Sequence, residues 1–77
     1  MKEIIGILTK KKLSINEWID PSKHRKHLYN VDNDSINLGD LIEVDSPDYN
    51  YYVQVVDIVK LPTFNNSEYL PIKNIIK

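Results

Sequence analysis

Two histidines three positions apart have the side chains and the spacing of a metal-ligand pair. His24 and His27 would share one face of a helical turn, and imidazole nitrogens are common metal ligands. Their neighbours are Lys23, Arg25 and Lys26, whose positive charges repel a cation. We therefore interpret this segment as a solvated basic loop and expect neither a metal site nor a cofactor.

A second pattern places carboxylates at the spacing of a calcium-binding loop. Asp32, Asp34, Asp40 and Glu43 match positions 1, 3, 9 and 12 of the EF-hand template. That template needs glycine at its sixth position for a sharp turn, and this chain has Asn37 there. We interpret the segment as an acidic turn that leads into a strand.

The residues that other catalytic mechanisms need are missing or isolated. The chain has no cysteine, and its two glycines, Gly6 and Gly39, are too far apart for a phosphate-binding loop. Asp57 is the one carboxylate that apolar neighbours could bury, and we interpret it in preference as marking a bulge or a partner-facing position. We expect no catalytic residues and no small-molecule substrate, so the chain is predicted not to be an enzyme.

Nucleic-acid binding has more support, because the chain combines a basic segment over residues 10–27 with several aromatic residues. Basic side chains supply phosphate contacts, and aromatic rings supply stacking surfaces for bases. The candidate contacts are Lys10, Lys11, Lys12, Trp18, Lys23, Arg25 and Lys26, with Tyr29, Tyr51 and Tyr52 as further stacking surfaces. Tyrosines also enlarge the core of a small barrel and are frequent at protein interfaces, so this pattern has two interpretations.

Charge is distributed unevenly along the chain although the formal net charge is only −1. Residues 1–30 hold seven Lys or Arg side chains against three acids, whereas residues 31–59 hold seven acids and no Lys or Arg. The acidic segment would repel a polyanion unless it faces away. Either the folded protein has two faces of opposite potential, or the two segments lie side by side and neutralise each other.

The elements that must position these residues are mostly strands. Residues 41–45 and 51–59 are rich in β-branched and aromatic side chains, and the Pro/Asp/Asn turn between them predicts an antiparallel hairpin. Gly39 and Asp40 form the turn before it. Further strands are expected at residues 4–9, with Gly6 at a bulge or a close backbone approach, and at residues 27–31. Residues 69–76 are expected to form a closing edge strand that tolerates Pro71.

The stretch between the first two strands is harder to interpret. Residues 13–19 fit either a strand or a capped helix, and Asp20 is expected to cap a short helical turn over residues 21–27 with Pro21 in its first position. Together, the expected strands and the short helical turn predict a single all-β domain over residues 1–77. It is a small closed or partly open β-barrel of the OB or SH3-like kind, with about five to six strands and at most one short helix, because closure removes exposed edges.

Three segments in a fixed order resemble the HAS-barrel, the small N-terminal β-barrel of HerA-type hexameric DNA translocases and of rotary ATP synthase subunits. They are Ile-Ile-Gly-Ile at residues 4–7, Asn-Leu-Gly-Asp-Leu-Ile-Glu-Val at 37–44 and Tyr-Val-Gln-Val-Val-Asp-Ile at 52–58. The family pattern runs IG-x-V, then GD-x-V-x-V, then V-x-V-x-x-I, and the resemblance covers residues 3–60. It implies a non-catalytic barrel that packs against neighbouring barrels in a ring and docks protein partners. No ATPase domain follows in these 77 residues, so a ring would need another chain or a longer parent protein.

The leading hypothesis is therefore a barrel that assembles with itself or with a nucleic-acid-processing ATPase. Edge pairing by residues 72–76 or by the first strand would supply main-chain hydrogen bonds, and the candidate interface residues are Tyr51, Tyr52, Ile72 and Ile75. Two alternatives are a nucleic-acid-binding barrel that uses the basic segment 10–27, and a small phage or mobile-element inhibitor of a host or viral enzyme. The apolar runs are far shorter than the roughly 20 residues of a membrane span, and no signal-peptide pattern is visible, so we expect a cytoplasmic protein.

Overall fold

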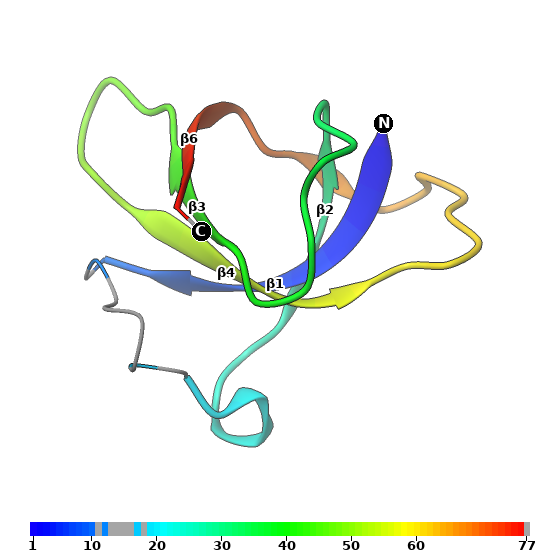
Figure 1. The fold of residues 1–77 in the computed structure, drawn as a ribbon, viewed down its shortest axis with the longest axis horizontal. Coiled ribbons are helices and arrows are strands. Elements are labelled where there is room, and N and C mark those ends of the chain that lie inside the picture. Colours follow the sequence, from blue (N-terminus) through cyan, green and yellow to red (C-terminus); the bar gives the residue numbers. More distant parts are fainter. Residues whose placement is uncertain (11, 13–16, 18, 77) are drawn as a thin grey trace.

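The chain folds as a strongly curled, mostly antiparallel sheet with one short helical turn, in a computed structural model that describes residues 1–10, 12, 17 and 19–76. The elements are β1 (Lys2–Thr9), the 3-10 helix η1 (Pro21–Lys23), β2 (His27–Val31), β3 (Leu41–Val44), β4 (Tyr52–Ile58), β5 (Glu68–Tyr69) and β6 (Ile72–Ile76). All-β composition, strand number and a partly open barrel shape confirm the predicted fold class (Figure 1).

The strands are arranged in the order β5-β2-β1-β4-β3-β6, so β1 and β4 lie at the centre of the sheet. Every neighbouring pair is antiparallel except β2 and β5, which are parallel. The first strand pairs with β2 on one side and with β4 on the other. The expectation that the first strand could offer a free edge is therefore wrong, because both of its edges are already used.

The segment between β5 and β6 bridges the two edges of the curled sheet. β5 and β6 lie at opposite edges of the sheet but are separated in sequence by only Leu70 and Pro71. Leu70 N–H donates to the carbonyl oxygen of Asn30 in β2 at 3.0 Å, and Asp45 N–H donates to the carbonyl oxygen of Pro71 at 2.9 Å. Figure 1 shows this crossover passing over the curled sheet from β2 to β3. The single closing strand expected at residues 69–76 is thus divided at Pro71, which has no N–H to donate but still offers its carbonyl oxygen.

Gly6 lies where β1 meets β4 most closely, at a shift in their register between Ile5 and Gly6. A Cβ atom at this position would clash with Cγ1 of Val53 and would lie 3.3 Å from the carbonyl oxygen of Gln54. Both halves of the Gly6 prediction, a bulge and a close approach, are confirmed. Gly39 has a φ of 90° in the turn before β3, a conformation that side chains with a Cβ rarely adopt.

The bulge also explains the position of Asp57. Ile5 pairs with Asp57 and Gly6 with Val55, so one extra residue of β4 lies between these pairs. Asp57 is exposed there, and its carboxylate accepts the N–H of Ile58 at 2.8 Å. The preferred interpretation, a bulge rather than a buried acid, agrees with this position. Among the described residues the buried acids are Glu3 and Asp40, for which the sequence analysis expected no burial.

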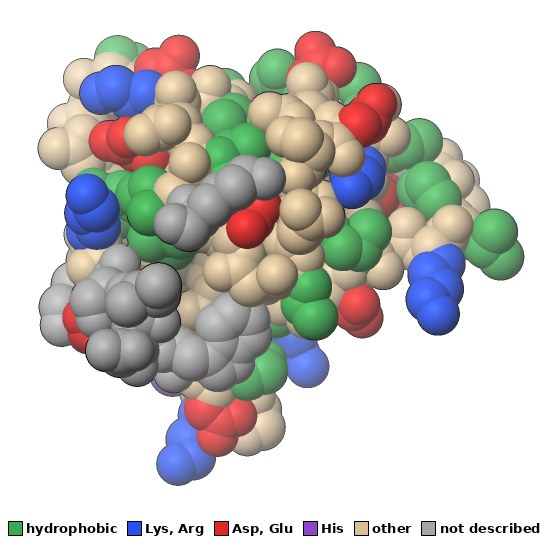
Figure 2. Space-filling model, viewed as in Figure 1, with side chains coloured by type: hydrophobic (Ala, Val, Ile, Leu, Met, Phe, Trp, Pro, Cys, Tyr) green, Lys and Arg blue, Asp and Glu red, His purple; other side chains and the backbone are tan. Residues whose placement is uncertain are grey.

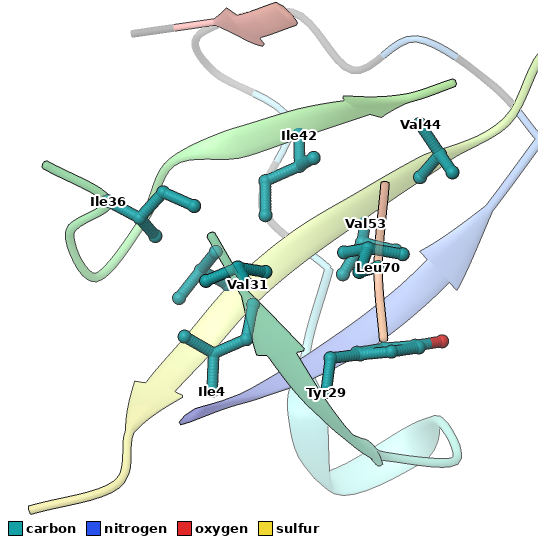
Figure 3. Packing of buried hydrophobic residues seen from close by; sticks show 9 residues of the cluster. Ile4, Tyr29, Val31, Ile36, Ile42, Val44, Val53 and Leu70 are labelled. Carbon is teal, nitrogen blue, oxygen red and sulfur yellow. The ribbon is translucent and has the colours of Figure 1, made fainter. Parts of the chain in front are cut away.

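The core lies on the concave side of the curled sheet and draws on almost every element. Ile4, Tyr29, Ile42 and Val53 meet there with side chains from the loop before β3 and from the crossover (Figure 3). The remaining members are Val31, Ile36, Val44, Val55 and Leu70. Because the crossover contributes Leu70, hydrophobic packing and main-chain closure depend on the same short segment.

The opposite face of β4 is covered as well. Gln54 is only 2% exposed, and its side-chain amide makes two hydrogen bonds with the backbone of Ile19. Ile19 N–H donates to Oε1 of Gln54 at 3.1 Å, and Nε2 of Gln54 donates to the carbonyl oxygen of Ile19 at 3.2 Å. The side chain thus pairs with Ile19 as a neighbouring strand would, and it holds this part of the chain against the sheet.

Replacing Gln54 with leucine should lower the free energy of unfolding by about 1 kcal/mol, since both backbone groups of Ile19 lose their partners but water can reach them. Trypsin should also cleave more rapidly after Lys12 and Lys23, in the stretch that Gln54 holds. Urea unfolding and timed proteolysis measure the two effects. An Asn65→Ala variant changes an exposed amide and should leave both unchanged; equal effects in the two variants would contradict the pairing.

The helical turn is shorter than expected but begins as predicted. Asp20 caps η1 by accepting the N–H of Ser22 at 3.0 Å and its hydroxyl at 2.8 Å, and Pro21 occupies the first position. These two hydrogen bonds lower the pKa of the Asp20 carboxyl, the backbone one most. The helix ends at Lys23 instead of extending to residue 27. Residues 13–16 and 18, which carry the open choice between strand and helix, lie outside the described residues.

Candidate functional site

A groove of about 400 Å³ opens at the end of the barrel where β1 ends and where β2 and β4 begin. β1 and the residue after it contribute Leu8 and Lys10, while β2 contributes His27 and Tyr29. The turn before β4 contributes Tyr49 and Tyr51, β5 contributes Glu68 and Tyr69, and the crossover contributes Leu70 and Pro71. Four of the five tyrosines of the chain therefore converge on one groove.

Aromatic rings form both the floor and the rim of this groove. Tyr29 is buried and forms the floor, whereas Tyr49 is 64% and Tyr69 55% exposed. Tyr49 and Tyr51 have ring centroids 5.7 Å apart at an interplanar angle of 46°, and His27 lies 6.0 Å from Tyr29 at 41°. These tilted arrangements are favourable for aromatic pairs.

Tyr29 connects the core to the groove. Its ring packs in the hydrophobic cluster, and Figure 3 shows its hydroxyl oxygen pointing away from the other labelled side chains. Burial raises the pKa of the Tyr29 hydroxyl above 10.0, and the negative charge of Glu68 and the nearby Tyr51 raise it further. The hydroxyl therefore stays protonated at neutral pH and is available as a hydrogen-bond donor.

This raised pKa predicts a loss of stability in alkali. Above the ordinary value of 10.0 the folded protein holds the Tyr29 proton more tightly than the unfolded chain does, so unfolding becomes more favourable as the pH rises. Below that value the contribution is constant. Urea unfolding at a series of alkaline pH values should show a smaller decline for Tyr29→Phe than for the unchanged protein. Tyr49→Phe, at an exposed ring, should follow the unchanged protein, and identical curves for the two variants would contradict the assignment to Tyr29.

The candidate nucleic-acid contacts lie in different places. Lys10 lines the groove, while Lys12, Lys23, Arg25 and Lys26 are exposed along the stretch that leads to β2. Lys11 and Trp18 lie outside the described residues. The two histidines do not share a helical turn: His24 follows η1, and its Nδ1 lies 3.2 Å from the carbonyl oxygen of Asp20, whereas His27 begins β2.

The candidate interface residues are also separated. Tyr51 lines the groove and packs against the core, whereas Tyr52 is half-buried at the start of β4. Ile72 and Ile75 pack against the core and line a second, more polar hollow of about 520 Å³ between β6 and the turn at residues 32–35. Tyr69 and Leu70 line both hollows, so the crossover separates them.

The outer edge of β6 is poorly suited to pairing with another strand. Its register with β3 shifts near Lys73, and the N–H of Ile75 donates to Oδ1 of Asn74 at 3.0 Å. A bulge, a charged side chain and an already satisfied N–H are features by which proteins protect sheet edges from further pairing. The groove is therefore the better candidate for an interaction site.

Acidic and basic side chains are intermixed on the face shown in Figure 2. The basic start of the chain also contacts the acidic segment directly, since the Met1 amino group pairs with Asp34 at 3.0 Å and Nζ of Lys2 donates to the carbonyl oxygen of Ile36 at 2.7 Å. At these contacts the basic and acidic segments lie side by side, which agrees with the alternative that they neutralise each other.

Across residues 1–10, 12, 17 and 19–76, no group of three His, Asp or Glu side chains is arranged to hold a metal ion. The same residues include no helix with the length and apolar character that a membrane crossing needs.

Sequence reasoning singled out Tyr29 and Tyr51 but missed Tyr49, Tyr69 and Glu68. Tyr49 lies in a turn and Tyr69 in a two-residue strand, where periodicity carries no information. The available signal was the number of tyrosines, five in 77 residues, which is high for so small a core.

A scan of protein-family models, a search of curated proteins and a search of solved structures each found no match to this chain. The HAS-barrel resemblance therefore stays a prediction.

Proposed function

We propose that this chain is a non-catalytic β-barrel module that mediates protein–protein assembly through its tyrosine-lined groove. The observation that carries the proposal is the gathering of exposed apolar side chains around a buried aromatic floor. Leu8 (45% exposed), Tyr49 and Tyr69 surround Tyr29. Exposed apolar patches of this kind mark interaction sites. Tyrosine is enriched in the buried centre of protein–protein interfaces relative to the rest of the protein surface.

The partner class that the HAS-barrel resemblance suggests, an ATPase ring that processes nucleic acids, belongs to the same proposal. A small barrel that offers exposed side chains for docking is compatible with that role. We also keep the cytoplasmic location expected from the sequence as part of this proposal.

Site-specific photocrosslinking in the native host tests the assembly function. A photoreactive phenylalanine analogue at Tyr69 should form adducts with protein, or with a second copy of the chain, at much higher yield than the same analogue at Phe64, an exposed aromatic residue outside the groove. Sedimentation over a range of concentrations separates self-association from binding of a different protein. Equal yields at both positions, together with a strictly monomeric chain, would overturn the proposal.

A second candidate function is binding of single-stranded nucleic acid. Lys10 favours this function because it lines the groove together with the tyrosines. The exposed Lys23, Arg25 and Lys26 also favour it, since they directly precede His27, which lines the groove as well. Affinity for an oligonucleotide should then fall steeply with salt and be lost on reversing the charge of Arg25. Adducts at Tyr69 that are sensitive to nuclease would favour this candidate over protein assembly.

A further inference from the structure

Three backbone groups at the groove are already hydrogen-bonded to other parts of the chain. The N–H of Leu70 is bonded to Asn30, the carbonyl oxygen of Pro71 to Asp45, and the carbonyl oxygen of Tyr51 to the N–H of Val44 at 3.1 Å. A partner strand therefore cannot use these three groups to extend the sheet. At these positions a ligand has to be recognised by side chains.

Every polar side chain among the described residues of the groove can donate a hydrogen bond, except that of Glu68, which only accepts when ionised. The donors are the four tyrosine hydroxyls, the His27 ring and the Lys10 ammonium group, and the four hydroxyls make no hydrogen bond to any described residue. Burial keeps the floor hydroxyl of Tyr29 protonated. The groove thus suits a ligand with many carbonyl oxygens, few N–H groups and apolar rings or methylenes to pack between aromatic faces.

A proline-rich segment has this combination of properties. Proline has no N–H, its ring is apolar, and a polyproline II helix presents its carbonyl oxygens to the surroundings without internal hydrogen bonds. Such segments are already extended before binding, so they lose little conformational entropy when they enter an aromatic groove.

The charges of the groove favour a peptide over a polyanion. Lys10 and Glu68 both line it, so the groove carries charges of both signs. Glu68 would repel a phosphate backbone but would attract a lysine or arginine next to the prolines, and its charge lies close enough to influence Tyr29.

We propose that the tyrosine groove binds a proline-rich segment of a partner protein in the polyproline II conformation, with a basic side chain of that segment beside Glu68. The inference rests on the proposed function and names the class of partner segment that the groove recognises.

Titration of the whole chain with synthetic peptides, followed by amide NMR and by anisotropy of a labelled peptide, tests this inference. The probe is a run of prolines ending in arginine, and its control has glycines in place of the prolines. The proline peptide should shift the amide signals of Tyr49, Tyr51 and Tyr69, and the glycine peptide should bind at least tenfold more weakly. Equal binding of the two peptides, or no binding of the proline peptide, would overturn the inference.

Variants identify the residues responsible. Tyr69→Ala should weaken binding of the proline peptide at least tenfold, as expected for an aromatic residue that dominates an interface, whereas Phe64→Ala should leave it unchanged. Glu68→Gln should abolish the preference for arginine over glutamine at the end of the peptide while binding of the prolines persists. Unchanged affinity in Tyr69→Ala would count against the inference.

The crosslinking experiment keeps this inference separate from the proposed function. Protein adducts at Tyr69 together with a proline peptide that fails to bind would reject the proline-rich ligand and leave assembly through the groove intact. Equal crosslinking at Tyr69 and Phe64, in a chain that stays monomeric, would instead reject the assembly proposal.

Discussion

Replacing Leu70 with alanine should lower the free energy of unfolding by about 2–5 kcal/mol, the range for removing a large buried aliphatic side chain. Leu70 is 3% exposed and packs in the core, while its own N–H holds the crossover to Asn30. A chain of 77 residues has a total stability of only about 4–12 kcal/mol, so the variant is expected to be partly unfolded at physiological temperature. Urea unfolding followed by far-ultraviolet circular dichroism measures the loss.

Leu61 provides a matched control for this experiment. Its side chain is 88% exposed, so Leu61→Ala should change the stability by no more than about 0.5 kcal/mol. Leu70→Met, which nearly conserves the volume, should cost less than about 1.5 kcal/mol. If Leu61→Ala and Leu70→Ala were equally stable, the crossover would not be part of the core. Because Leu70 also lines the groove, a folded Leu70→Ala protein should bind the proline peptide more weakly.

Replacing Gly6 with alanine should destabilise the protein by about 3 kcal/mol, since overpacking of a filled core forces the backbone or side chains to move. The added methyl group would clash with Cγ1 of Val53 and approach Cδ2 of Tyr29 at 3.5 Å. The strands β1 and β4 would have to separate at the bulge. Chemical unfolding of the single variant gives the magnitude.

A double-mutant cycle identifies the cause of that loss. Val53→Ala removes the Cγ1 atom that the new methyl group would meet, at the cost of a cavity. If the clash is responsible, the Gly6→Ala, Val53→Ala protein should be more stable than the sum of the two single losses allows, by about 1 kcal/mol or more. If the two losses of stability were strictly additive, Gly6→Ala would destabilise the protein for a reason other than a clash with Val53.

The fold could be predicted from the sequence wherever local chemistry and burial agree. The hairpin of β3 and β4 follows from β-branched residues on both sides of a Pro/Asp/Asn turn, and Gly6 and Gly39 mark positions where a Cβ is not tolerated. The division at Pro71 was not predicted, because it depends on two sheet edges that are distant in sequence and that meet only after the sheet curls.

The candidate site was less predictable because it is assembled from four separate segments. Lys10, Tyr29 and Tyr51 were recognised by residue type, but nothing local indicates that they meet Tyr49 and Tyr69.

The burial of acidic side chains was hard to predict for a related reason. Asp57 has apolar neighbours in sequence but lies at an exposed bulge, whereas Glu3, near the start of β1, is 3% exposed. Burial is decided by the strands and loops that pack on a residue, and these are often distant from it in sequence.

The crossover at Leu70 and Pro71 has a consequence for synthesis of the protein. During translation, β1 to β4 leave the ribosome before residues 68–76, so the outer edges of β2 and β3 have no partners until the crossover emerges. Unpaired strand edges on a nascent chain favour aggregation, and contacts between distant segments form slowly. Chaperones that shield exposed strands should therefore matter most in the interval before residues 68–76 have emerged from the ribosome.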